Sequence, residues 1–377
     1  MSIDDDVLLI NASNIKVGGG LQVAISVVSS LLLNDRGKDI YFAVSQRVYE
    51  QLYIPEILYN RVFIVDLNIK SVTASFEALR SLDKLVVDYK ITKVFSLFGP
   101  TYWNPKEICH LIGFANAWLV SPEKKTYKVF SNVQSIKMKI KNYILGYLLY
   151  KKRNHYVTET CDMKNKFIDY FNHNENKIHV VSNCLSPLFI NNNSTKFDFL
   201  NNIKKTKFIT ISHNYPHKNL SVIEKVAQEL NSRGLECIFV VTFSHDEYEK
   251  QTELFKKHTI NIGTLTIADC ANAYSSCDAL FLPTLLECFT ISYLEAMKIN
   301  IPIFTSNLSF AKDLCGDCAS YFDPFSIENI VETLEDYILE PESYDFHQRY
   351  IGHLAKFPSN ESRVDSYLKI IEKMKNE

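Results

Sequence analysis

The sequence lacks a long apolar segment and a secretion signal. A helix needs roughly 20 consecutive apolar residues to cross a bilayer, and the longest candidate, residues 143–150, is much shorter and follows Lys141 directly. Residues 4–6 are all Asp, whereas a signal peptide carries Lys or Arg near its start. These absences predict a cytoplasmic protein.

An excess of one charge and a cysteine framework are absent too. The 41 basic and 43 acidic side chains leave a net charge of −2, which argues against a nucleic-acid-binding protein but leaves room for a local basic surface. The nine cysteines are scattered and odd in number, which favours buried reduced thiols over disulfides. Cys315 and Cys318 have the spacing of a redox or zinc pair without a second pair, so a plain turn bearing two thiols is the favoured interpretation.

What is present is a repeated alternation of strand-like and helix-like segments in 377 residues, a length too great for one ordinary core. Such alternation predicts parallel sheets covered on both faces, with ligands at the carboxyl ends of the strands. We therefore predict an α/β protein of two Rossmann-like domains facing across a cleft, at residues 1–190 and 196–358, and a last helix at 359–377 that packs back on the first domain. Strand-like runs occur at residues 7–12, 40–44, 62–67, 93–98, 110–115, 156–160, 177–182, 207–212, 237–242, 279–282 and 301–305.

The second half opens with clear local signals. The polar run at residues 191–195 predicts a linker. Asn219 is a candidate N-cap and Gly234 a stop signal for one helix, and the charged residues 246–258 predict the next helix.

Three consecutive glycines, Gly18, Gly19 and Gly20, lie between the first strand and an apolar helix. Glycine lets the backbone approach a ligand closely, and the N-terminus of the following helix favours an anion. The dinucleotide-binding pattern would need Gly or Ala in place of Val23 and an acid after the second strand, whereas Asp39 precedes that strand. A phosphate-contacting loop and a simple tight turn both remain open here.

An acidic pair, Glu287 and Glu295, stands in the most informative segment of the second half. Eight positions along a helix span roughly 12 Å, comparable to the distance between the two sugars of a nucleotide diphosphate sugar. A helix that begins near Thr290 would offer free N–H groups to phosphate oxygens. The alternative is a solvated loop acid plus a helix-surface acid, which the apolar neighbours Phe289 and Ile291 make less favourable.

These residues resemble the E-x7-E motif of retaining GT-B glycosyltransferases, specifically family 4 (group 1). Residues 210–220, T-I-S-H-N-Y-P-H-K-N-L, resemble the loop where a lysine meets the donor diphosphate, and residues 263–283 resemble the stretch before the acidic pair. Residues 179–183, H-V-V-S-N, are similar to the V-x-P-N-G element before the interdomain linker. The resemblance implies transfer of a sugar from a nucleotide-sugar donor, with no metal or other cofactor required.

Carried over by position, the resemblance assigns the donor-site roles. Glu295 would accept the ribose hydroxyls, Glu287 would contact the transferred sugar, and Lys218 would neutralise the leaving diphosphate. Cys288 and Thr290 stand where the family commonly has glycine, so the donor sugar stays open. The remaining implied donor contacts are the backbone around Phe289, Thr290 and Ile291, the loop Gly18, Gly19 and Gly20, and His213 or His217 in place of a family arginine.

On the acceptor side, many family members carry a catalytic histidine after a strand of the N-terminal domain. In this sequence that place is closer to Asn116, and His110 precedes the expected strand. His110 is either a substrate contact or a satisfied structural histidine. Asn116 and Trp118 suit hydrogen bonding and stacking on a saccharide, although Trp118 fits a core position equally well.

Residues 124–153 carry nine Lys or Arg and no acid, interleaved with apolar residues. This pattern predicts an amphipathic helix with a basic rim that attracts anionic lipid, or else a domain helix with solvated lysines. Enzymes of this kind often act on polyprenyl-diphosphate-linked glycans, so the resemblance implies an enzyme of surface polysaccharide or O-antigen assembly on the inner face of the cytoplasmic membrane. Two alternatives stay open: a GT-B-shaped sugar-nucleotide epimerase and a non-catalytic nucleotide-sugar-binding partner.

Overall fold

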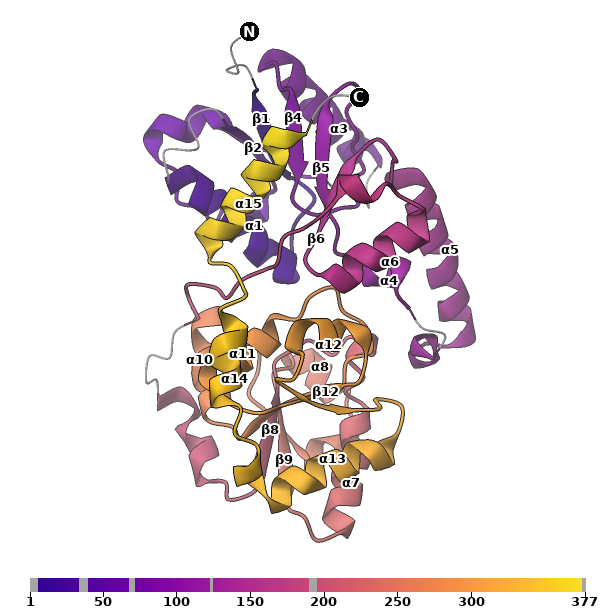
Figure 1. The fold of residues 1–377 in the computed structure, drawn as a ribbon, viewed down its shortest axis with the longest axis vertical. Coiled ribbons are helices and arrows are strands. Elements are labelled where there is room, and N and C mark those ends of the chain that lie inside the picture. The colour runs from indigo at the N-terminus through magenta and orange to yellow at the C-terminus, as the bar shows by residue number, and fades with distance from the viewer. Residues whose placement is uncertain (1–5, 34–39, 68–71, 123–124, 190–194, 375–377) are drawn as a thin grey trace. The chain divides into compact units, whose positions relative to one another are not determined.

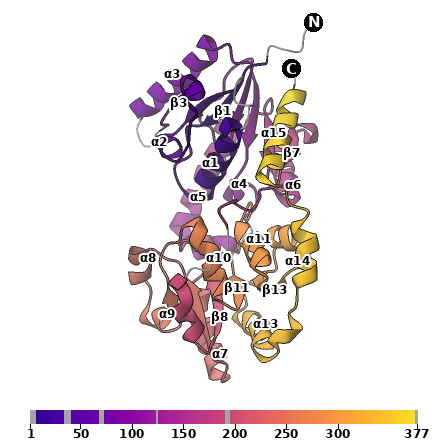
Figure 2. The same cartoon turned by 90° about the vertical axis from the view of Figure 1, so that its left-hand side faces the viewer.

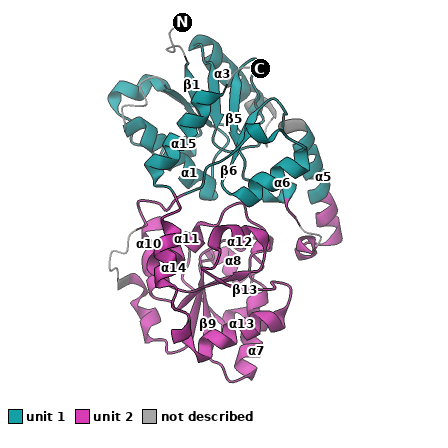
Figure 3. Cartoon of the chain, viewed as in Figure 1, with its two compact units in different colours: residues 1–120, 138–183, 358–377 teal, residues 121–137, 184–357 magenta. Residues whose placement is uncertain are grey.

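The computed structural model describes residues 6–33, 40–67, 72–122, 125–189 and 195–374. Among the positions discussed above, Asp4, Asp5, Asp39, Lys124 and residues 191–194 of the expected linker lie outside this set. The chain divides into two compact units (Figure 3), and each collects separate stretches of sequence. Unit 1 holds residues 1–120, 138–183 and 358–377, and unit 2 holds residues 121–137 and 184–357.

Unit 1 is built on a seven-stranded sheet in the order β3-β2-β1-β4-β5-β6-β7 (Figure 1). All strands pair in parallel, with Leu9 opposite Tyr41 on one side and Val94 on the other. All five residues of β1 are buried, as expected for a central strand covered on both faces. The strands are β1 (Leu8–Ala12), β2 (Ile40–Val44), β3 (Val62–Ile64), β4 (Lys93–Ser96), β5 (Cys109–Gly113), β6 (His155–Thr158) and β7 (Ile178–Val180).

The helices of unit 1 cover both faces of this sheet, and the last one comes from the C-terminus. α15 (Asn360–Lys373) runs beside α1 (Gly18–Leu33) in both views (Figure 1, Figure 2). Its Tyr367 ring lies 4.8 Å from the ring of Phe95 between centroids, and its buried Arg363 donates hydrogen bonds to Ser26 and Asn183. The others are α2 (Gln46–Tyr49), α3 (Val72–Asp88), α4 (Ala117–Val120), α5 (Asn132–Leu149), whose first turns are grouped with unit 2, and α6 (Cys161–Phe171).

Unit 2 repeats the plan with a six-stranded parallel sheet in the order β10-β9-β8-β11-β12-β13. In both sheets the strand order reverses beside the first strand, which is the doubly wound arrangement of Rossmann-like domains. The predicted α/β class with two such domains is therefore confirmed. The strands are β8 (Thr206–Thr210), β9 (Cys237–Val241), β10 (Thr259–Asn261), β11 (Ala279–Leu282), β12 (Ile303–Ser306) and β13 (Ser320–Phe322).

The helices of unit 2 connect these strands or follow the last of them, and a short 3-10 turn, η6 (Pro216–Lys218), comes after β8. None of the helices in the described parts of the chain is long and apolar enough to cross a membrane. The longer helices are α7 (Val222–Ser232), α10 (Ile267–Ser275), α11 (Ile291–Ile299), α12 (Ser309–Cys315), α13 (Ile327–Leu339) and α14 (His347–Leu354).

Two local predictions in this unit are wrong. The single helix predicted at 246–258 is two helices, α8 (His245–Glu249) and α9 (Glu253–Lys257), because the Thr252 hydroxyl accepts a hydrogen bond from Phe255 N and starts a new helix. Asn219 is not the N-cap of α7. It ends η6 in the left-handed conformation, and its amide donates to the carbonyl of Pro324.

Candidate active site

An ion pair stands at the switch point of the unit 2 sheet. Lys218 lies in η6, which follows β8, and Glu287 lies in the loop after the neighbouring strand β11. The Lys218 Nζ and Glu287 Oε1 atoms are 2.6 Å apart, and the side chains are only 16% and 11% exposed. The structure thus brings together two residues that the sequence analysis singled out, at the carboxyl ends of adjacent parallel strands.

A threonine that the sequence analysis missed holds this pair. The Thr284 hydroxyl, fully buried, lies 2.8 Å from the same Oε1 atom of Glu287 and donates to it. The backbone N–H of Leu285 donates to the His217 carbonyl at 2.7 Å, so the two loops that carry Lys218 and Glu287 are joined directly. The only signal for Thr284 in the sequence is its position after Pro283, in the loop between a strand and a helix. A single hydroxyl residue does not by itself form a recognisable motif.

The two histidines of the η6 segment differ in their surroundings. Burial lowers the pKa of His217, with Lys218 lowering it further and Glu287 opposing, so its ring is neutral near pH 7. His213 is exposed, and its Nδ1 lies 3.4 Å from Glu247 Oε2. Because Glu247 also caps α8 with its carboxylate, His213 is held toward that helix in this structure, and its contact with donor stays a prediction.

Glu295 is buried inside unit 2, on the second turn of α11. It is 7% exposed, and its Oε2 accepts a hydrogen bond of 3.2 Å from the Tyr274 hydroxyl. Burial raises the pKa of Glu295 to about 7, and the Tyr274 hydrogen bond acts in the opposite direction. A carboxyl group in such a position can accept ligand hydroxyls when it is ionised.

The N-terminus of α11 lies between the two acids in the sequence and has no side-chain cap. Thr290 is its N-cap, but the Thr290 side chain makes no capping hydrogen bond. The Thr290 hydroxyl is buried and has no partner among the residues that the structure describes. The free N–H groups of the first turn, near Phe289 and Ile291, and this unused hydroxyl provide donors for an anion.

The glycine loop lies in unit 1, where Gly18 begins α1. Its φ of +71° is in the left-handed region, which favours glycine, and a Cβ atom at Gly18 or Gly19 would meet nothing within 4 Å. At Gly20 such an atom would lie 3.5 Å from the Phe98 ring. The loop backbone is therefore open at Gly18 and Gly19, and its contact with a donor stays a prediction.

His110 is inside a strand, not before it as the sequence analysis placed it. It is the second residue of β5, is 2% exposed, and has its Nε2 2.8 Å from the Ser96 hydroxyl. Ser96 also accepts a hydrogen bond from the Asn11 amide, and the buried His110 Nδ1 atom has no hydrogen-bond partner among the residues that the structure describes. Burial lowers the pKa of His110 to about 3. His110 is therefore buried in unit 1, and its contact with substrate stays a prediction.

Asn116 and Trp118 follow β5 and are both half-buried. The Trp118 carbonyl accepts a hydrogen bond of 2.8 Å from the Asn142 amide on α5. Their contact with an acceptor stays a prediction.

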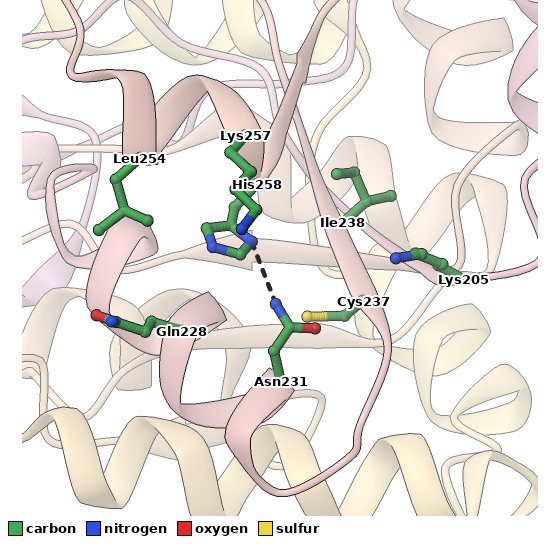
Figure 4. A pocket seen from close by; sticks show the side chains of 8 residues that line it. All are labelled: Lys205, Gln228, Asn231, Cys237, Ile238, Leu254, Lys257 and His258. Carbon is green, nitrogen blue, oxygen red and sulfur yellow. Dashed lines mark hydrogen bonds between the residues drawn. The ribbon is translucent and has the colours of Figure 1, made fainter.

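Two hollows in unit 2 lie away from these residues. The larger, about 340 Å³, opens near the amino end of β9, between α7 and α9 (Figure 4), and the smaller is about 220 Å³. Neither contains a predicted site residue, and across the described ranges no three His, Cys, Asp or Glu are grouped to hold a metal ion. The larger hollow is lined by Lys205, Gln228, Asn231, Cys237, Ile238, Leu254, Lys257 and His258.

Comparisons with known proteins bear on the fold and on the C-terminal half of the chain. Residues 191–351 match the family described as "Glycosyl transferases group 1", and none of the curated proteins matches the sequence. A glycosyltransferase from Rickettsia africae is similar in structure, with a TM-score of 0.71 at 13% identity over 98% of both chains.

Two further solved structures cover 98% of this chain and 100% of their own. Anabaena HepE in complex with UDP and glucose has a TM-score of 0.69 at 11% identity. WaaG, a glycosyltransferase involved in lipopolysaccharide biosynthesis, has a TM-score of 0.68 at 13% identity. The chain therefore has the GT-B fold, and its residues 191–351 match the family of group 1 glycosyl transferases.

Proposed function

We propose that the protein is a retaining glycosyltransferase of family 4 that moves a sugar from a nucleotide-sugar donor to a glycan acceptor. One observation carries the proposal: the Lys218–Glu287 ion pair stands at the switch point of a doubly wound sheet, where such sheets bind ligands. The α11 N-terminus, with its unpartnered Thr290 hydroxyl, follows Glu287 in the same unit.

Lys218 is the cation for the donor diphosphate. When donor binds, the ammonium group exchanges its contact with Glu287 for the phosphate oxygens, and the Thr290 hydroxyl and first-turn N–H groups of α11 bind the same anion. Negative charge grows on the diphosphate as the bond to the sugar C1 breaks, so these groups lower the barrier more than they strengthen ground-state binding. Glu295 accepts the ribose hydroxyls. Gly18, Gly19 and Gly20 are proposed as further donor contacts, and no metal or other cofactor is required.

Glu287 keeps a partner when Lys218 moves, because the Thr284 hydroxyl still donates to it. The carboxylate is then held in place to accept a hydroxyl of the transferred sugar. In the retaining reaction the acceptor oxygen bonds to C1 on the face that the diphosphate leaves, and the acceptor proton passes to the departing phosphate oxygen. No protein nucleophile is needed in this scheme.

The nature of donor and acceptor is inferred from similar structures. HepE was solved with UDP and glucose, and WaaG and the galactosyltransferase WaaB act in lipopolysaccharide biosynthesis or its outer core. By analogy, we propose a UDP-sugar donor and a surface glycan as acceptor, such as a polyprenyl-diphosphate-linked O-antigen intermediate on the inner face of the cytoplasmic membrane. A thermal-shift panel of nucleotide sugars tests the donor, since only a bound one raises the melting temperature.

Alanine substitutions test the site. Lys218→Ala and Glu295→Ala should each abolish sugar transfer, measured with purified donor and acceptor, while circular dichroism shows a folded protein. Lys298→Ala, an exposed lysine on the same helix as Glu295, should retain the full rate. Full activity in either site variant would contradict the assignment. Donor incubated without acceptor should stay unchanged; an isomerised sugar would indicate an epimerase.

A further inference from the structure

The larger hollow of unit 2 lies where the amino ends of three neighbouring strands meet. β10, β9 and β8 follow one another in the sheet. Lys205 precedes β8, Cys237 begins β9 and His258 precedes β10, and all three line this hollow of about 340 Å³ (Figure 4). Lys218 and Glu287 follow the carboxyl ends of strands in the same parallel sheet, at its opposite edge. The hollow is therefore separate from the candidate active site.

The charged side chains that line this hollow are positive. Its eight lining residues include Lys205 and Lys257 and no Asp or Glu. Lys257 is exposed, and it has no acidic partner within 4 Å among the residues that the structure describes. Lys205 lies 3.4 Å from Glu236, whose side chain is 71% exposed, so this pair is weak and exchanges readily for another anion. The smaller hollow differs, because its Asp278 already pairs with Lys207 at 2.9 Å.

The buried ring of His258 lies within the field of both lysines. His258 is 8% exposed, and its Nδ1 atom lies 3.2 Å from the amide nitrogen of Asn231, the contact dashed in Figure 4. Burial lowers the pKa of His258. The ammonium groups of Lys257 and Lys205 lower this pKa further, whereas Glu224 raises it. Positive charge from two separate segments therefore converges on one point of the hollow.

The remaining walls suit the carbon skeleton of a small molecule. Ile238 and Leu254 are half-buried apolar side chains, and Gln228 adds an exposed amide. Cys237 is 2% exposed, and burial raises the pKa of its thiol to about 12, with Lys205 opposing. The thiol is uncharged near pH 7, so it does not repel an anion. A volume of about 340 Å³ falls within the usual range of small-molecule sites, roughly 300–1,000 Å³.

We propose that this hollow binds a small organic phosphate, with the phosphate group held by Lys205 and Lys257 and the carbon skeleton against the apolar wall. Two ammonium groups without a lining acid suit a dianion better than a single carboxylate. The phosphate takes the place of Glu236 beside Lys205. Inorganic phosphate offers the same charge without an apolar part, so it should bind more weakly. This site does not depend on the proposed sugar transfer.

Histidine NMR tests the site at one of its own residues. The Cε1–H signal of His258, assigned by its absence in His258→Gln, is followed between about pH 4 and 8 with and without phenyl phosphate. Bound phosphate should raise the pKa of His258 by about one unit, because a nearby negative charge stabilises the imidazolium. Sodium chloride at equal ionic strength should raise it much less. Inorganic phosphate should need a higher concentration; equal affinity would overturn the role of the apolar wall.

Lysine substitutions locate the bound phosphate. Lys205→Gln combined with Lys257→Gln should abolish the phosphate-dependent rise, and both side chains are at least partly exposed, so the fold does not depend on them. The matched control is Lys312→Gln, an exposed lysine on α12 that lines neither hollow and should leave the rise unchanged.

Lys218→Ala separates this site from the candidate active site. The rise should persist in this variant, because Lys218 lies at the other edge of the sheet. Its loss there would assign the phosphate to the candidate active site and overturn the proposal. No rise in the wild-type protein, or an equal rise in the double lysine variant, would overturn it as well.

Discussion

At the scale of single residues, chemistry was easier to predict than position. Lys218 and Glu287 are 69 positions apart, and the motif resemblance selected both before their contact at 2.6 Å was visible. His110 was placed before its strand, whereas it is the second residue of β5, and this difference moves its side chain from a loop into the core. Thr284 was missed because its role exists only through the geometry of Glu287 and the η6 turn.

Thr284 gives the prediction at this scale. Thr284→Val keeps the shape but removes the hydrogen bond to Glu287, so we expect kcat to fall about tenfold, the order of a hydrogen bond to a charged group. KM for the donor should change little, because Lys218 and Glu295 remain. Thr284→Ser should restore the rate, as measured by steady-state kinetics.

Thr210→Val is the matched control. Thr210 is also buried, and its hydroxyl donates to the carbonyl of Phe281 on β11, so its loss should lower stability without lowering kcat. If Thr284→Val and Thr210→Val reduced kcat alike, Thr284 would have only a structural role.

At the scale of elements, long periodic segments were predictable and some short ones were not. β10 and β13 have three residues each and carry only one or two apolar residues, whereas the equally short β3 and β7 lie within longer apolar runs that were predicted. The break between α8 and α9 was hidden for another reason: residues 246–258 are charged throughout, and the signal for a new start is the single hydroxyl of Thr252. Hydrophobic periodicity shows which face of a helix or strand is buried. The start of a helix, by contrast, can depend on one side-chain atom, such as the hydroxyl oxygen of Thr252.

The substitution Thr252→Ala distinguishes two separate helices, α8 and α9, from one continuous helix at residues 246–258. If α9 starts at Thr252, the substitution removes a capping hydrogen bond of 3.0 Å to Phe255 N and should lower the free energy of unfolding by about 1 kcal/mol. In one continuous helix, alanine would raise it instead, because alanine has the higher helix propensity. Thr252→Ser should retain the wild-type value in urea denaturation.

At the scale of the whole molecule, the alternation of strands and helices was enough to predict two Rossmann-like sheets. A last helix at 359–377 that packs back on the first domain was also expected, whereas the grouping of residues 121–137 with unit 2 was not. Returning segments such as α15 depend on tertiary contacts, for example the ring contact between Tyr367 and Phe95. Two units with separate cores should also unfold in separate transitions. Each unit holds one glutamate whose pKa burial raises to about 7, Glu159 in unit 1 and Glu295 in unit 2.

These two glutamates predict a pH dependence that is specific to each unit. A carboxyl group whose pKa is raised by folding holds its proton in the folded state between about pH 4.5 and 7, whereas the unfolded chain has lost it. Unfolding then releases a proton, so stability is highest below the unfolded pKa and falls as pH rises through this window. For the buried Glu295 a shift from 4.5 to about 7 corresponds to about 3 kcal/mol at most.

Calorimetry at pH 5 and pH 7.5 checks this expectation. Glu295→Gln should flatten the pH dependence of one unfolding transition, and Glu159→Gln that of the other, because each carboxyl group contributes only to its own unit. Glu332→Gln, an exposed glutamate on α13, should change neither transition. If both substitutions flattened the same transition, the two units would unfold as one cooperative body, and the separate cores of the two sheets would not act as independent folding units.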